Sequence, residues 1–151
     1  MSDDWDCYPL LVDSEPASIY LNLGLKADAP NQTQTYMSYV RVFMRQARPD
    51  GLSSHEEFED LTGLEDALTD NFSGSTHTTY VGRNTSSRNR DFYFYTADEA
   101  RFVTLALDAM ARHPQYQFEI GGRTDPDWDT YLGFLYPSPD DLKRCCQTNC
   151  N

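Results

Sequence analysis

Hydrophobic and polar residues alternate with period two in five stretches of the chain, which is the pattern of half-buried β-strands. The predicted strands are residues 17–23, 39–45, 78–83, 90–95 and 115–120. The third and fourth are rich in tyrosine and phenylalanine, and the polar run between them, residues 84–89, is predicted to be a hairpin loop. Gly121 and Gly122 are predicted to end the last strand.

Apolar residues recur instead at three- and four-residue steps in two longer stretches, which predicts two amphipathic helices. The first runs from about Ser54 to Asp70 and opens with a capping box of Ser53 and Ser54 with Glu56 and Glu57; its apolar stripe is Phe58, Leu61, Leu64, Leu68 and Phe72. The second follows a capping box of Thr96 with Glu99 and ends before Pro114.

Two short helices are predicted at the C-terminal end. Asp125-Pro126 and Ser138-Pro139 each place a capping residue before proline, which is the usual start of a helix. Residues 145–151 are predicted to be a frayed tail.

The order of these elements predicts one α+β domain over residues 1–151. From the second strand onward the order is β-α-β-β-α-β, which is the ferredoxin-like split unit with both long helices on one face of an antiparallel sheet. The first strand is then expected at an edge of the sheet, next to that unit.

The charge of the chain restricts its partners. Twenty-four acidic and 12 basic residues give a net charge of −12. Such a chain repels duplex nucleic acid, so a basic protein surface is the better candidate partner. The alternative is that the acidity only keeps the protein in solution.

The first residues, Met1 to Asp6, are acidic and carry no apolar segment, so they do not form a secretory signal. No stretch long and apolar enough to cross a membrane follows. A cytoplasmic protein without membrane contact is therefore expected, and structural disulfides are not expected there. Cys145, Cys146 and Cys150 have no role that the sequence identifies.

The first predicted helix is crowded with carboxylates on its polar side. Glu59, Asp60 and Asp66 are the candidate residues for docking a basic protein. The alternative is that they only solvate the helix and match its dipole.

Three arginines in or beside the predicted hairpin loop, Arg83, Arg88 and Arg90, are a candidate site for an anion. Salt bridges to the acidic helix would explain the same arginines equally well.

The motif Asp-Trp-Asp-x-Tyr occurs twice, around Trp5 and around Trp128. Two aromatic and acidic corners of one cleft would explain the repeat, and so would two tryptophans that each anchor a chain end to the sheet. The second interpretation predicts two buried indoles with aspartates capping nearby amides.

The sequence lacks the motifs of known catalytic and cofactor sites, including the nucleophile elbow, the P-loop, the dinucleotide fingerprint and H-E-x-x-H. No catalytic residue, metal ligand or cofactor site is predicted, and whether the chain is an enzyme stays open, with a non-catalytic role favoured.

Blocks of residues along almost the whole chain resemble the bacterial family known as domain of unknown function 695. They are Asp4-Trp5-Asp6, residues 16–19, 44–46 and 48–53, Gly82-Arg83-Asn84-Thr85, residues 90–95, Pro126-Asp127-Trp128 and residues 135–139. The family has no established activity, so the resemblance implies no catalytic residues. Some members are joined to, or distantly similar to, the regulator of ribonuclease E activity B, an acidic ferredoxin-like protein that acts by binding.

Together these observations predict a non-catalytic binding or regulatory module with an acidic surface and a link to RNA turnover. The alternative is an enzyme or sensor that binds a small anionic ligand through the 82–90 hairpin. The partner, the ligand and the oligomeric state cannot be read from the sequence.

Overall fold

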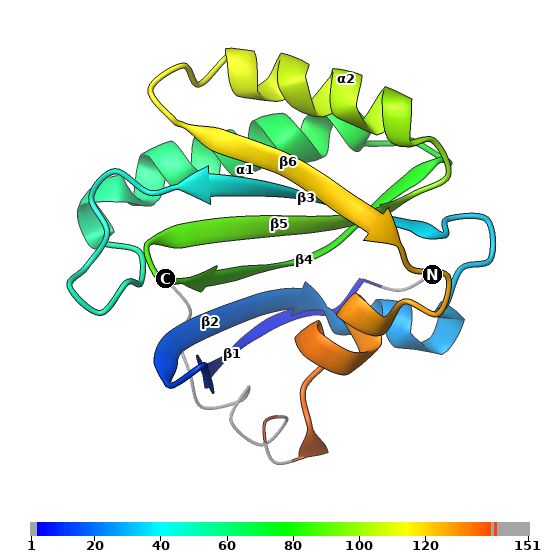
Figure 1. Cartoon of the computed structure of the whole chain (residues 1–151), viewed down its shortest axis with the longest axis horizontal. Coiled ribbons are helices and arrows are strands. Elements are labelled where there is room, and N and C mark those ends of the chain that lie inside the picture. The colour runs from blue at the N-terminus through cyan, green and yellow to red at the C-terminus, as the bar shows by residue number, and fades with distance from the viewer. Residues whose placement is uncertain (1–2, 140, 142–151) are drawn as a thin grey trace.

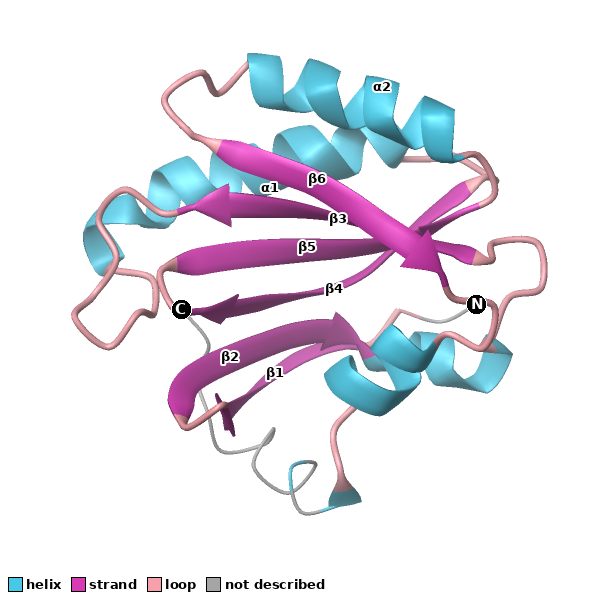
Figure 2. Cartoon of the chain, in the orientation of Figure 1, coloured by secondary structure: helices cyan, strands magenta, loops and turns pink. Residues whose placement is uncertain are grey.

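The computed structural model describes residues 3–139 and 141. Its elements are β1 (Trp5–Val12), β2 (Glu15–Asn22), η1 (Leu23–Asp28), β3 (Tyr36–Phe43), η2 (His55–Glu57), α1 (Phe58–Phe72), β4 (Thr78–Ser86), β5 (Asn89–Thr96), α2 (Glu99–Ala111), β6 (Phe118–Thr124) and η3 (Thr130–Leu135). The strands form one antiparallel sheet of six strands in the order β1-β2-β4-β5-β3-β6 (Figure 1, Figure 2). The predicted α+β class is confirmed.

One face of the sheet is covered by the two long helices. α1 and α2 contact each other and share a single core with β3 and β5 (Figure 1). Phe102 of α2 is fully buried, with the rings of Phe72 and Phe94 at 5.2 and 5.1 Å. The predicted placement of both helices on one face is therefore correct.

The opposite face carries a second core beneath η1 and η3. Ile19, Leu21, Val81 and Tyr95 of the sheet meet Trp128 and other apolar residues of the C-terminal segment there. The Trp128 ring stacks on Tyr95 at 4.1 Å, and its indole N–H donates to the carbonyl of Gln34 at 2.8 Å. Both faces of the central strands are thus buried, because the period-two alternation sends Phe94 to one core and Tyr95 to the other.

The carboxylate of Asp125 fixes η3 to this second face. Its Oδ2 accepts the hydroxyl of Tyr95 at 2.6 Å and the amide of Thr130 at 3.1 Å, while Oδ1 accepts the amide of Asp129 at 2.9 Å. Burial raises the pKa of Asp125, but these hydrogen bonds outweigh it and lower the pKa overall. The predicted helix start at Asp125-Pro126 is wrong, because η3 begins at Thr130, but the Asp125 carboxylate does accept amides at the start of that helix.

The N-terminal part of the sheet differs from the prediction. Residues 5–12 form an additional strand, β1, which pairs with β2 through a hairpin whose turn, Asp13 and Ser14, has positive φ angles. β2 pairs with β4 on one side and with β1 on the other, so β1 is the edge strand. The expected position of the first predicted strand at the sheet edge is therefore wrong. Pro9 is compatible with an edge strand because it lacks the N–H that an inner strand needs.

The predicted loop over residues 84–89 does not form. β4 continues to Ser86 and β5 begins at Asn89, which leaves only Ser87 and Arg88 in the turn. Both have positive φ angles, 50° and 70°, as a tight type I′ turn requires. The polar residues on either side therefore belong to strands and point to alternate faces.

Neither capping box forms as predicted. Ser54 makes no side-chain cap, and Glu57 is buried with its carboxylate accepting the amides of Arg45 and Gln46 at 2.9 and 2.8 Å. The cap of α2 is Asp98, which accepts the amide of Arg101 at 3.0 Å. Phe58, predicted to lie in the apolar stripe of the first helix, is 51% exposed.

Gly121 and Gly122 do not end the last strand, since β6 continues through them to Thr124. A Cβ on Gly121 would lie 2.4 Å from the Tyr39 hydroxyl oxygen. Glycine is needed here because the Tyr39 ring lies across β6.

Cys7 is disulfide-bonded, so the expectation that disulfides are absent is wrong. The other three cysteines, Cys145, Cys146 and Cys150, lie outside the described residues, as do the predicted tail over residues 145–151 and most of the second short helix. None of the helices in the described part of the chain has the length and apolar character to span a membrane.

Truncating Phe102 tests the packing of α2. Phe102→Ala should lower the free energy of unfolding by about 3–5 kcal/mol, because it opens a cavity between two rings in a close-packed core. Chemical denaturation measures this value. Leu107→Ala on the same helix removes a side chain that is 48% exposed and should change it by less than about 0.5 kcal/mol. Equal effects of the two substitutions would contradict the assigned buried face.

Alkaline pH should destabilise the protein through its buried tyrosines. Burial is the main cause that raises the pKa of Tyr93, Tyr95, Tyr116 and Tyr131 above the ordinary value of 10.0. At a pH between the tyrosine pKa of the unfolded chain and the raised pKa of the folded chain, each of these side chains is protonated only in the folded state. The contribution of the four tyrosines to the free energy of unfolding is therefore complete below about pH 10 and decreases above it. Denaturation midpoints between pH 8 and pH 11 test this.

The tyrosine variant Tyr95→Phe serves as the internal comparison. It should reduce the slope of unfolding free energy against pH above about pH 10 by up to about 1.4 kcal/mol per pH unit, the value for one proton. A slope that is unchanged in Tyr95→Phe would show that Tyr95 already ionises in the folded protein.

Candidate functional site

The outer side of α1 carries exposed carboxylates in a row that begins in η2. We call this surface the acidic face; it consists of Glu56, Glu59, Asp60, Asp66 and Asp70. Within the described residues none of the five takes part in a salt bridge. The three predicted docking residues therefore lie together, exposed and uncompensated, because Leu61, Leu64 and Leu68 occupy the buried side of the helix.

A groove runs beside the acidic face, between α1 and the strands β2 and β4. We call it the α1 groove; it consists of two adjoining hollows of about 400 and 320 Å³ that share Tyr20 and Glu65. One hollow is lined by Trp5, Tyr20 and Tyr80, and the other by Phe58, Asp66 and Arg83. The groove exists because the β1–β2 hairpin extends the sheet beyond the edge that α1 covers.

The floor of the α1 groove is aromatic. The Trp5 ring lies 5.0 Å from the ring of Tyr20 and 5.1 Å from that of Tyr80. Such faces attract cations through their negative quadrupole. Trp5 is only half-buried, so part of its ring is available to a partner.

Glu65 lies at the centre of the groove and is already paired. It accepts the Tyr80 hydroxyl at 3.0 Å and forms a salt bridge with Arg83. Burial first, and then Glu65, raise the pKa of Tyr80 well above its ordinary value, so its hydroxyl stays protonated and donates. The Arg83 guanidinium lies 4.6 Å from the centroid of the Tyr20 ring. The groove thus holds a guanidinium of its own chain between a ring and a carboxylate.

A β-bulge brings Tyr80 and Arg83 to the same side of β4. The register of β4 against β5 shifts between Tyr80 and Gly82, so that Tyr80 pairs with Phe94 and Arg83 with Phe92. Phe92 and Phe94 belong to the helix-side core, so both side chains face α1. In a regular strand, residues three positions apart would face opposite sides of the sheet.

The three arginines of the predicted anion site have different surroundings. Arg90 is buried and donates to Thr85 Oγ1 at 2.9 Å and to Ser53 Oγ at 3.1 Å. Burial, and then the charge of Arg83, lower its pKa to about 10. Arg88 is exposed in the tight turn, and Arg83 is paired with Glu65. The alternative that an arginine pairs with the acidic helix is correct for Arg83.

The two tryptophans lie on opposite sides of the sheet and share no cleft. Trp128 is a buried anchor, as predicted, although the amides nearby are capped by Asp125 rather than by the aspartates of the motif. Trp5 is partly buried and lines the α1 groove, and Asp6 beside it accepts the amide of Cys7 at 2.8 Å. The tyrosines of both motifs donate to backbone carbonyls, Tyr8 to Leu135 and Tyr131 to Asn22, each at 2.6 Å.

Sequence reasoning missed the aromatic floor of the groove. Tyr20 and Tyr80 stand at positions where the strand pattern expects polar side chains. Two aromatic residues at such positions are the one sign in the sequence that this side of β2 and β4 does more than face solvent. Their meeting with Trp5 depends on the pairing of the β1–β2 hairpin with β4, which is distant in sequence.

No cluster of three or more histidine, cysteine, aspartate or glutamate residues suited to a metal ion occurs within residues 3–139 and 141.

Comparison with known proteins gives one result. The model of a family described as a family of unknown function, DUF695, matches residues 3–136. No curated protein and no solved structure matches the chain significantly.

Proposed function

Since the chain belongs to the DUF695 family, whose function is unknown, we propose from the geometry of α1 that it is a non-catalytic module that binds a basic protein segment. The observation that carries the proposal is the border between the acidic face and the α1 groove. Among residues 3–139 and 141 the carboxylates of the acidic face have no salt-bridge partner, and they lie beside an aromatic floor, which is the combination that suits lysine and arginine side chains.

Phe58 adds an apolar contact to this surface. It is 51% exposed, lies between Glu57 and the acidic pair Glu59 and Asp60 in sequence, and lines the same hollow as Asp66. Exposed aromatic residues surrounded by polar ones frequently become the energetic centres of protein interfaces. The proposed partner therefore carries basic residues next to an apolar one.

The position of Arg83 supports the same chemistry. Its guanidinium rests on Tyr20 and pairs with Glu65 inside the groove. A partner's guanidinium or ammonium group would find equivalent surroundings at Trp5 and Asp70, which line the hollow next to it. The alternative proposal, an anionic ligand held by Arg83, Arg88 and Arg90, lacks such support because the three side chains have different surroundings.

For the fold, we infer that β3, α1, β4, β5, α2 and β6 form a ferredoxin-like unit. The adjacency of the strands in the order β4-β5-β3-β6 and the position of both helices on one face support this inference. The β1–β2 hairpin then extends the β4 edge and supplies one wall of the α1 groove.

A link to RNA turnover stays a prediction that rests on the resemblance to the ribonuclease E regulator alone. A cytoplasmic location also stays a prediction, and the disulfide at Cys7 argues against it, because disulfides are uncommon in reducing compartments.

Charge reversal on the acidic face tests the docking proposal. Fluorescent peptides of equal length are titrated into the protein and followed by anisotropy: one alternates lysine with leucine, and the other alternates glutamate with leucine. The basic peptide should bind, and the triple variant Glu59→Lys, Asp60→Lys and Asp66→Lys should weaken it by about tenfold at low salt, as three exposed charge pairs imply. The affinity of the native chain should fall as salt screens charges over a Debye length of about 8 Å at physiological ionic strength.

A matched variant separates a specific surface from net charge. Glu15→Lys, Asp28→Lys and Asp127→Lys change the same number of exposed carboxylates at positions away from α1. This variant should keep most of the affinity, whereas Trp5→Ala should lose affinity because it removes part of the aromatic floor. Equal losses from the two triple variants, with no effect of Trp5→Ala, would mean that the acidic face is only a solvated surface.

A further inference from the structure

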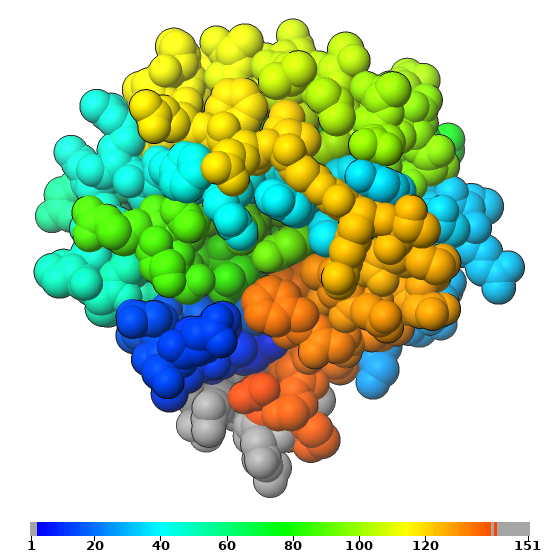
Figure 3. Space-filling model, in the orientation of Figure 1, coloured from blue at the N-terminus to red at the C-terminus, as the bar shows by residue number. Residues whose placement is uncertain are grey.

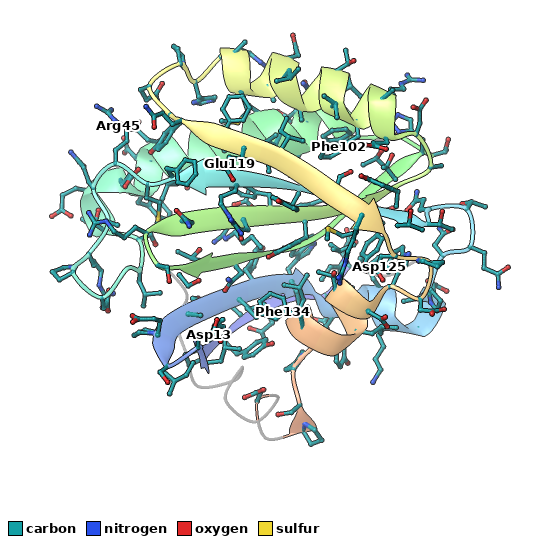
Figure 4. All side chains as sticks on the ribbon, viewed as in Figure 1. Asp13, Arg45, Phe102, Glu119, Asp125 and Phe134 are labelled. Carbon is teal, nitrogen blue, oxygen red and sulfur yellow. The ribbon has the colours of Figure 1, made fainter. Side chains whose placement is uncertain are left out.

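Another hollow lies on the other side of the sheet, where η3 borders β3, β5 and β6. Its volume is about 390 Å³, within the range of small-molecule sites. We call it the tyrosine–arginine pocket; the side chains that matter are Tyr39, Arg41, Tyr93, Arg123, Asp129 and Phe134. Figure 3 shows this side of the molecule, with orange η3 against cyan β3 and green β5, and Figure 4 labels Phe134 on η3. It shares no lining residue with the α1 groove.

Three aromatic rings form the apolar part of the pocket. The Tyr93 ring of β5 has two ring neighbours: the tilted ring of Tyr39 on β3 at 6.4 Å and the edge-on ring of Phe134 on η3 at 6.2 Å. Tyr39 pairs with both Tyr93 and Gly121, and the lack of a side chain on Gly121 leaves room for the Tyr39 ring over β6. The rings therefore make a partly open cup that fits a flat apolar group.

Arg41 presents a fixed guanidinium beside the cup. Its Nε and Nη2 donate to the two carboxylate oxygens of Asp91 at 2.9 and 3.1 Å, and its Cζ lies 5.6 Å from the centroid of the Tyr39 ring. A guanidinium has five N–H groups, so this bidentate pair leaves donors on Nη1 for another acceptor. Asp91 holds the side chain in position before any ligand arrives.

Tyr93 adds a neutral hydroxyl to the same corner. Burial first, and then the charge of Asp91, raise its pKa, which keeps the hydroxyl protonated.

Arg123 adds a positive charge to the pocket and Asp129 adds a negative one. Arg123 donates to Thr130 Oγ1 at 3.1 Å, and within the described residues it has no salt bridge. Asp129 is exposed, and its backbone is held by the hydrogen bond of its amide to Asp125 at 2.9 Å. Arg41 and Arg123 supply N–H donors for an anion, while three carboxylates and the net charge of −12 disfavour a highly charged one; the carboxylates are Asp91, which pairs with Arg41, Glu119, which lies opposite Arg41 on β6, and Asp129.

We propose that the tyrosine–arginine pocket binds a small aromatic monocarboxylate, with its ring against Tyr39, Tyr93 and Phe134 and its carboxylate at Arg41 and Arg123. The guanidinium forks match the planar carboxylate, and the three rings supply the apolar contact that such a molecule needs. An aromatic amine is disfavoured because an ammonium group offers no acceptor to the free N–H groups of the two arginines. The proposal is independent of docking at α1, since the two surfaces lie on opposite faces of the sheet.

Calorimetric titration of the whole protein with four probes tests the ligand class. Phenylacetate and indole-3-acetate contain both the ring and the carboxylate, phenethylamine has a ring with the opposite charge, and acetate has no ring. The two aromatic carboxylates should bind with a dissociation constant of about 1 mM or tighter, and the other two should bind more weakly. Absence of binding by both aromatic carboxylates in this range, or equal binding of phenethylamine, overturns the proposal.

Two variants of opposite sign locate the ligand within the pocket. Arg123→Gln should weaken phenylacetate binding by about fivefold, and Asp129→Asn should strengthen it by about twofold, because each removes one charge near the ligand carboxylate. Both residues are exposed, so the fold tolerates the changes.

Their matched controls, Arg101→Gln and Asp127→Asn, alter exposed residues that do not line the pocket and should leave the affinity unchanged. If each control changes binding as much as its partner variant, the ligand lies elsewhere and the assignment to this pocket is wrong.

Discussion

The buried carboxylate of Asp125 is the contact on which the second face of the molecule depends. It accepts hydrogen bonds from Tyr95 in the middle of the sheet and from two amides at the start of η3, so one side chain joins β5 to the C-terminal segment. A buried carboxylate is tolerated only when such donors replace water. With η3 held in this way, Trp128 can stack on Tyr95, and Phe134 can reach the ring of Tyr93.

The sequence predicts the helix-side core well, because that core follows simple periodicity. Leu61, Leu64 and Leu68 recur at helical steps, and Phe92 and Phe94 alternate with residues of the other face. The α+β class and the two helices on one face follow from these patterns. The second core is harder to predict, since it depends on Trp128, Tyr131 and Leu135 meeting strands that lie more than 30 residues away in sequence.

The errors have local physical causes. Both hairpins turn through residues with positive φ that are not glycine, Asp13-Ser14 and Ser87-Arg88, so the usual sequence marks of a type I′ turn are absent. As a result the sequence pattern does not predict β1, and it predicts a six-residue loop over residues 84–89 where the structure has a two-residue turn. Glu57 has the spacing of a capping residue, but tertiary contacts with Arg45 and Gln46 use its carboxylate instead.

For the candidate surfaces too, the sequence predicts what depends on neighbouring residues and does not predict what depends on distant strands. Glu59, Asp60 and Asp66 could be placed on the exposed side of a helix from spacing alone, and they are exposed there. The ring of Trp5 between Tyr20 and Tyr80, and the pairing of Arg41 with Asp91 across 50 residues, depend on strand register, which a single sequence does not determine.

The bulge in β4 then decides which side chains meet in the α1 groove. The tight turn at Ser87 and Arg88 pairs Arg83 with Phe92, which fixes Arg83 on the α1 side. In a regular strand the residue three positions earlier, Tyr80, would face the opposite side, but the register shift pairs it with Phe94 and returns it to the α1 side. Tyr80 and Arg83 therefore both reach Glu65, one with a hydroxyl and the other with a guanidinium. One inserted residue in the strand thus gives a partly buried carboxylate two donors from the same strand and completes the aromatic floor beside Trp5.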